Sequence, residues 1–288
     1  FQKIANESLE KKDAFFTTFS AQFYKNLMQA NFLFTQSEGL SAEKLLQENV
    51  ALFEKNMHMV DVKPFAYIGT LRNKAVNELG LMRYNELFAT IAKMDAFVKN
   101  FGHTNKYYEI LTENLKLFIY IPMGEFEKAL TIAKKLEVLY ENIAPTKVIQ
   151  REKLLQNYAL AYIYIGLGEF KLANQHINRL LNEQESNFRS DLYCFAHILS
   201  LIIHFELGNS ELLDYRIKTT YRLLLRRNKL HAFEKHILTF LKEFDKPRKN
   251  PQELIDGFIA LKTNIEKATE SKIEKNALSL FDLISFSL

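Results

Sequence analysis

Residues Gly168–Leu181 read GEFKLANQHINRLL, and similar sequence occurs at other places in the chain. Gly124–Tyr140 reads GEFEKALTIAKKLEVLY, and Gly208–Leu224 reads GNSELLDYRIKTTYRLL. A fourth copy at Met82–Val98, MRYNELFATIAKMDAFV, lacks the initial glycine. In chain order the four copies start 42, 44 and 40 residues apart. Recurrence at this spacing is typical of proteins built from stacked helical units.

Each copy follows a stretch whose apolar residues have helical spacing. A period of about 42 residues accommodates two helices of roughly 16–20 residues and two short turns. A glycine between the two helices allows the positive φ or close backbone approach that a tight turn needs. The sequence therefore predicts antiparallel helix pairs, with turns at Gly124, Gly168 and Gly208.

The segment NYALAYIYIGLGEFKLANQHINRLL, residues 157–181, resembles a tetratricopeptide repeat (TPR). Asn157 stands at that family's usual Trp and Glu185 at its usual Pro, and the period exceeds the roughly 34 residues of a standard repeat. The chain from about residue 60 to its terminal FDLISFSL also resembles the C-terminal part of uncharacterised bacterial TPR-like proteins. The resemblance implies a right-handed α-α superhelix. The matching TPR positions are Leu160, Ala161, Tyr164, Gly168, Ala173 and Ile177.

The composition favours a helical protein. Of 288 residues, 48% are apolar and 25% charged, and only 9 Gly and 5 Pro leave few places for turns. We expect an all-α fold in one helical-repeat domain over residues 1–288, with residues 250–288 as a terminal capping pair. Because the chain begins at Phe1 rather than Met, we expect it to be part of a longer protein.

The single cysteine, Cys194, excludes an intramolecular disulfide and a cysteine-rich zinc site. The first thirteen residues carry charges throughout and contain no signal-peptide core. The richest apolar run, Phe195–Phe205, is too short to cross a membrane and contains two histidines. We therefore expect a cytoplasmic protein with no membrane association.

Several short motifs resemble catalytic or metal sites without meeting their requirements. GLGEFKLA, residues 166–173, lacks the third glycine and the preceding strand of a dinucleotide loop. HAFEKH, residues 231–236, has the wrong spacing for a zinc-protease motif. Cys194, His197 and His204 lie near one helical face but are too few for a tetrahedral metal site. We expect no enzymatic activity, no metal and no cofactor.

Basic residues concentrate in one region. Residues 209–250 contain eleven Lys or Arg against five acidic residues. A predicted helix carries a basic stripe beside a buried stripe of Leu213, Ile217, Tyr221 and Leu224. Three interpretations stay open for the basic stripe: a solvated face, a site for an acidic protein partner and a site for nucleic acid. The basic stripe is Lys218, Arg222, Arg226 and Lys229.

A second candidate surface is the concave face that first helices line in TPR proteins. An apolar groove there could take an amphipathic helix or a hydrophobic peptide. The same side chains could equally be buried against the next turn of the superhelix. The expected groove residues are Arg72, Asn114, Phe118, Tyr158, Tyr162 and Phe195.

These features favour a non-enzymatic scaffold that binds a protein or peptide. A different possibility is the peptide- or ligand-sensing C-terminal domain of a bacterial transcriptional regulator. A weaker alternative is nucleic-acid binding through the basic stripe. The sequence identifies neither the partner nor the oligomeric state.

Overall fold

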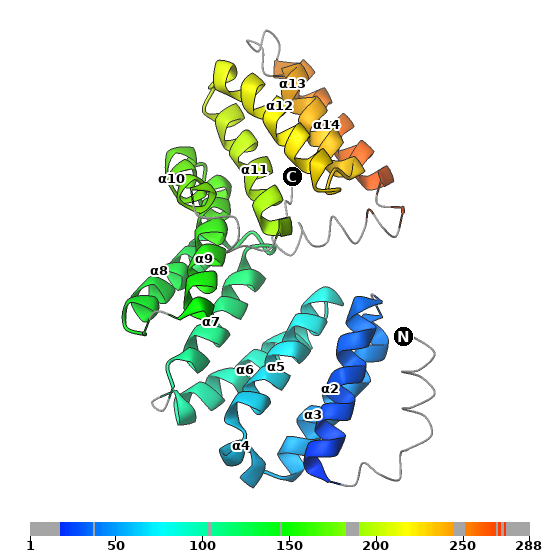
Figure 1. Cartoon of the computed structure of the whole chain (residues 1–288), viewed down its shortest axis with the longest axis vertical. Coiled ribbons are helices and arrows are strands. Elements are labelled where there is room, and N and C mark those ends of the chain that lie inside the picture. Colours follow the sequence, from blue (N-terminus) through cyan, green and yellow to red (C-terminus); the bar gives the residue numbers. More distant parts are fainter. Residues whose placement is uncertain are drawn as a thin grey trace. The chain divides into compact units, whose positions relative to one another are not determined.

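The structure is a computed structural model that describes residues 18–36, 38–102, 105–144, 146–182, 190–244, 251–268, 270, 271 and 274. These residues form thirteen α-helices, α2 to α14, and contain no β-strand (Figure 1). The predicted all-α fold is thereby confirmed for the described part of the chain. By the distribution of its contacts the chain divides into two compact units, Phe1–Leu115 and Lys116–Leu288.

The first unit is built from neighbouring helices in chain order. Helix α2 packs against α3, α3 against α5, and α5 against both α6 and the short α4. Helix α7 begins in this unit and ends in the second. The helices are α2 (Phe19–Thr35), α3 (Gly39–Lys55), α4 (His58–Val62), α5 (Pro64–Gly80), α6 (Tyr84–Phe101) and α7 (Tyr107–Tyr120).

The second unit continues the same pattern, each helix from α8 onward packing against the next. Helix α9 also contacts α11, and α11 contacts α13, so alternate helices touch as well as successive ones. Such contacts are typical of stacked helix pairs. The helices are α8 (Phe126–Glu141), α9 (Lys147–Gly166), α10 (Phe170–Leu181), α11 (Ser190–Glu206), α12 (Ser210–Arg226), α13 (Ala232–Phe244) and α14 (Pro251–Ala268).

The turns after α7, α9 and α11 share one geometry. Gly124, Gly168 and Gly208 have φ of 70°, 73° and 69°, in the left-handed region where glycine carries no Cβ penalty. At Gly168 the backbone N–H donates to the carbonyl of Ile165, and the next N–H donates to that of Tyr164. This pair of hydrogen bonds is a Schellman motif, which satisfies carbonyls at the end of α9.

The same motif closes two helices without glycine. Met82 after α5 and Asn228 after α12 have φ of 57° and 52° and make equivalent hydrogen bonds. Met82 is the residue that replaces glycine in the fourth sequence copy. Asparagine tolerates this conformation, whereas methionine adopts it less readily. The repeat therefore retains its turn geometry even where glycine is absent.

Gly166, two residues before Gly168, has a different role. It is the last residue of α9, and a Cβ added to it would collide with the ring of Phe126 on α8. Its requirement is close approach between helices, while Gly168 supplies the turn conformation.

The sequence SAEKLLQENVALFEKN, residues 41–56, predicts a helix with Ser41 as its N-cap. Helix α3 instead begins at Gly39, and its capping residue is Glu38. In the predicted terminal pair, the first helix is present as α14, and residues 275–288 lie outside the described residues.

Candidate functional site

The expected groove residues are mostly core residues. Tyr158 and Tyr162 on α9 are 0% and 3% exposed, and Phe195 on α11 is also buried. Asn114 on α7 is buried and Phe118 on the same helix is half-buried, while Arg72 on α5 is exposed. The sequence left two interpretations open for these aromatic side chains, an open groove or burial within the chain. The second, burial in the chain's own packing, describes Tyr158, Tyr162 and Phe195.

The reason lies in how α9 is surrounded. Residues 158–163 of α9 are all buried, and the helix packs against α8, α10 and α11. Over these residues α9 is covered on every side, so this segment has no concave face to offer a partner. The candidate surfaces therefore lie on helices that keep an exposed side.

Helix α12 keeps such a side. Its buried stripe consists of Leu213, Ile217, Thr220 and Leu224, at helical spacing. Tyr221 is 44% exposed, so its predicted burial is wrong. Thr220, one residue earlier, takes the core position with 2% exposure.

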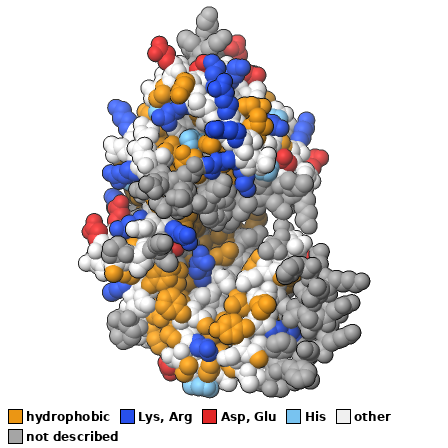
Figure 2. Space-filling model, in the orientation of Figure 1, with side chains coloured by type: hydrophobic (Ala, Val, Ile, Leu, Met, Phe, Trp, Pro, Cys, Tyr) orange, Lys and Arg blue, Asp and Glu red, His pale blue; other side chains and the backbone are white. Residues whose placement is uncertain are grey.

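The predicted basic stripe holds in part. Lys218, Arg222 and Arg226 lie exposed on α12, whereas Lys229 follows the end of the helix and is half-buried. Exposed apolar side chains share this side, with Tyr215 66% and Leu225 55% exposed. In Figure 2 blue and orange side chains gather over the part of the molecule that α12 and its neighbours occupy in Figure 1. The α12 outer face is Leu212, Tyr215, Lys218, Tyr221, Arg222, Leu225 and Arg226.

The charges on this face are only partly compensated. Lys218 Nζ donates to Asp214 Oδ2 over 2.7 Å, and this hydrogen bond holds the pKa of Asp214 below its usual value. Arg222 and Arg226 make no hydrogen bond or ion pair with the described residues. Two arginines that lie one turn apart repel each other, so an anionic partner would stabilise them.

A polar seam joins α11 to α12. Tyr193, His197, Ser200 and His204 recur along one side of α11. Arg216 Nη1 donates to Ser200 Oγ over 2.7 Å, and the Asn209 side chain contacts His204 Nδ1 over 3.1 Å.

The surroundings of His197 and His204 in this seam lower the pKa of both histidines. Burial and, to a smaller extent, the positive charge of Arg216 together lower the pKa of His197 to about 4. The pKa of His204 is lowered by the same two causes. The positive charge of Arg216, which acts on both imidazoles, would also repel a metal cation.

HAFEKH forms the start of α13. Glu234 Oε2 accepts the backbone N–H of His231 over 2.9 Å, and Glu274 Oε2 accepts that of Ala232 over 2.8 Å. Both carboxyls thus satisfy N–H groups that a helix N-terminus leaves free. Burial, helped by the charge of Glu274 and opposed by the backbone hydrogen bonds, raises the pKa of Glu234 to about 8.

The described part of the chain contains no group of three or more His, Cys, Asp or Glu side chains that could hold a metal ion. None of its helices has the length and apolar character needed to cross a membrane.

Comparisons with protein-family models, with curated proteins and with solved structures give no match to this chain. Arguments about function therefore rest on the chain's own surfaces.

Proposed function

We propose that this protein is a non-enzymatic helical scaffold that binds an acidic protein segment through the α12 outer face. The observation that carries the proposal is the exposure of Arg222 and Arg226, without an anionic partner among the described residues, beside Tyr215, Tyr221 and Leu225. Tyrosine and arginine are the residues that most often dominate protein interfaces.

The proposed scaffold is a TPR-like right-handed superhelix. The repeated Schellman turns and the contacts of α9 with α11 and of α11 with α13 support this architecture. In such a solenoid the second helix of each pair keeps an outward side, as α12 does. The partner then approaches that outward side rather than the buried first helices.

A protein partner explains this face better than nucleic acid does. Phosphates need cations, and because Lys218 is already bonded to Asp214, the exposed cations of α12 without an anionic partner among the described residues are Arg222 and Arg226. Exposed leucines such as Leu225 add nothing to phosphate binding, but they bury against apolar side chains. The partner segment therefore carries acidic side chains next to apolar ones.

Fluorescence anisotropy with defined probes tests the proposal. The first probe is a fluorescein-labelled amphipathic peptide, EELLEEYLEELL, and the second is a scrambled peptide of the same composition with its apolar face dispersed. A single-stranded oligo-dT probe tests nucleic acid. We expect the amphipathic peptide to bind most tightly, because only that peptide presents acidic and apolar groups on adjacent faces of a helix.

Matched variants locate the binding. Arg222→Glu with Arg226→Glu should weaken binding at least tenfold, because like charges then face each other. Leu225→Ser should weaken it while leaving the charge unchanged. Lys153→Glu with Lys171→Glu, two exposed lysines on α9 and α10, changes the net charge equally and should have little effect. Equal binding of the scrambled peptide, tighter binding of oligo-dT or no binding at all would each contradict the proposal.

A further inference from the structure

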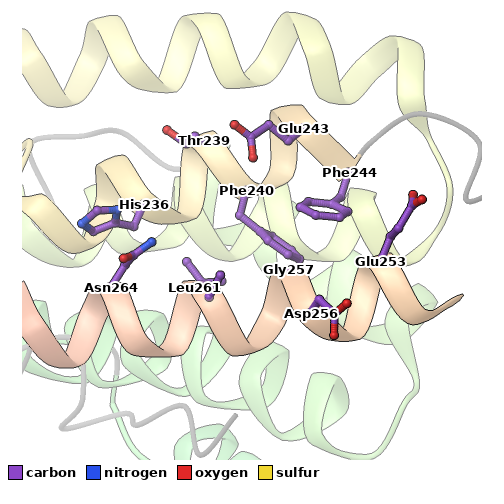
Figure 3. A pocket seen from close by; sticks show the side chains of 11 residues that line it. His236, Thr239, Phe240, Glu243, Phe244, Glu253, Asp256, Gly257, Leu261 and Asn264 are labelled. Atoms are coloured by element: carbon purple, nitrogen blue, oxygen red, sulfur yellow. The ribbon is translucent and has the colours of Figure 1, made fainter. Parts of the chain in front are cut away.

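A pocket of about 490 Å³ lies between α13 and α14. Figure 3 shows the side chains that line it, from His236 and Asn264 at one end to Phe244 and Glu253 at the other. Its volume falls within the range of roughly 300–1,000 Å³ that small-molecule and side-chain sites occupy. Both helices belong to the second unit, and the pocket is separate from the α12 outer face.

The floor of the pocket is aromatic. The rings of Phe240 and Phe244 stack with centroids 4.9 Å apart, and Phe240 also contacts Phe258 on α14 at 4.6 Å. A Cβ at Gly257 would collide with the Phe244 ring, so glycine at this position lets the ring lie against the backbone of α14. In Figure 3 both rings extend from α13 toward α14 at this point.

The rim of the pocket is acidic at the aromatic end. Glu243, Glu253 and Asp256 line this end, and no lysine or arginine is among the described residues that line the pocket. Asp256 accepts a hydrogen bond from the Gln252 amide over 3.0 Å. Glu243 and Glu253 make no hydrogen bond or ion pair with the described residues. Three carboxylates beside aromatic rings thus have no compensating cation among the lining residues.

An aromatic floor beside uncompensated carboxylates favours a ligand side chain that is both planar and positively charged. A guanidinium is planar and weakly hydrated, stacks on aromatic faces and donates two parallel hydrogen bonds to a carboxylate. An ammonium group lacks the planar fork, and an apolar side chain leaves the carboxylates uncompensated. We propose that the pocket between α13 and α14 binds an arginine side chain from a basic segment of a partner protein.

Peptide binding measured by fluorescence anisotropy tests the proposal. The probe is the fluorescein-labelled peptide AARLARAA, compared with the same peptide in which citrulline replaces both arginines. Citrulline has almost the same shape but no charge. We expect the citrulline peptide to bind at least tenfold more weakly and a lysine version to show an intermediate affinity. Equal binding of the arginine and citrulline peptides would overturn the proposal.

Two variants assign binding to the pocket. Glu253→Gln with Asp256→Asn removes two rim charges at exposed positions and should weaken arginine-peptide binding at least fivefold. Gly257→Ala should displace the Phe244 ring and also weaken binding, with far-UV circular dichroism confirming that the helices persist. Glu137→Gln, an exposed acid on α8, is the control and should bind as the unaltered protein does. Unchanged binding in the rim variant would contradict the assignment.

Two other possible occupants of the pocket, an arginine of the chain itself and a second copy of the chain, can be distinguished by experiment. Arg248→Ser removes an arginine of the chain itself between α13 and α14 in sequence, and it should leave peptide binding unchanged. Tighter peptide binding in this variant would make Arg248 the occupant and overturn the proposal. Sedimentation velocity should show no dimer. A dimer dissociated both by the rim variant and by Arg222→Glu with Arg226→Glu would make a second copy the occupant.

Discussion

The two units differ in the kinds of side chain that pack inside them. In the first unit an aromatic chain of five rings runs from α2 to α7, with successive centroids 5.5, 5.2, 5.7 and 5.1 Å apart. In the second unit burial moves the pKa of two titratable groups far from its ordinary value, that of His197 to about 4 and that of Glu234 to about 8. Aromatic packing is indifferent to pH, whereas buried titratable groups couple folding to pH. The aromatic chain is Phe23, Phe53, Tyr67, Phe97 and Tyr108.

Breaking the aromatic chain should have the largest effect. Phe53 is fully buried and contacts both Phe23 and Tyr67, so Phe53→Ala should lower the free energy of unfolding by about 3–5 kcal/mol. Urea denaturation measures the loss, and hydrogen exchange should locate it in α3 and α5. The loss should be the same at pH 5 and pH 7.5. As a control, Phe88→Ala on the exposed side of α6 should cost less than about 0.5 kcal/mol. A loss below about 1 kcal/mol for Phe53→Ala would contradict this role.

Glu234 should produce the next largest effect, and this effect depends on pH. Its pKa is about 8 in the folded protein against 4.5 ordinarily, so the folded state retains a proton that the unfolded state has lost. Stability is therefore lost as pH rises from 4.5 to 8. Glu234→Gln keeps an acceptor for the His231 N–H without this proton linkage. The free energy of unfolding of this variant should exceed that of the parent protein by about 4 kcal/mol at pH 8, and Glu211→Gln should give no such difference.

His197 should couple stability to pH in the opposite direction. Its folded pKa of about 4 lies below the ordinary 6.5, so between these values the unfolded state binds more protons. Stability therefore falls as pH decreases from 6.5 toward 4, by about 1–2 kcal/mol at pH 5. His197→Gln should remove this part of the decrease in urea titrations at pH 5 and 7.5. His58→Gln, on the exposed side of α4, provides the comparison, and an unaltered slope in His197→Gln would refute the assignment.

The smallest effect should come from Tyr221. Because this side chain is exposed, Tyr221→Ala should change the free energy of unfolding by less than about 0.5 kcal/mol. Leu224→Ala, on the buried side of the same helix, should cost about 2–5 kcal/mol. Urea denaturation of the two variants checks which side of α12 packs against the protein, and a large loss for Tyr221→Ala would reverse the assignment.

The turn positions could be predicted from the sequence, because glycine recurs where the backbone needs positive φ and the surrounding apolar spacing is helical. The buried side of α12 could be predicted only in part. Tyr221 and Thr220 both fit a helical stripe with Ile217 and Leu224, and hydrophobicity favoured the wrong one. Packing of α12 against α11 and α13 decides which of these two residues is buried, and the spacing of apolar residues in the sequence does not encode that packing.

The burial of the expected groove residues on α9 could not be predicted either, for a different reason. The segment from Tyr158 to Ile163 is apolar on every side of α9, so no periodicity separates a partner-facing side from a core-facing one. No sequence motif indicates the pocket between α13 and α14. It depends on the pairing of Phe244 with Gly257, thirteen residues away across segments that only the fold brings together.

The five Schellman turns have a consequence for how such a chain can change in length. Successive turns of the same geometry bound each two-helix segment of the chain, so a segment duplicated from one turn to the next would inherit working junctions at both of its ends. Copying the 44 residues from Gly124 to Leu167 would insert a second copy of α8 and α9 and leave its neighbours in the same kind of connection. Growth or loss of the protein by whole modules therefore requires no newly evolved loop.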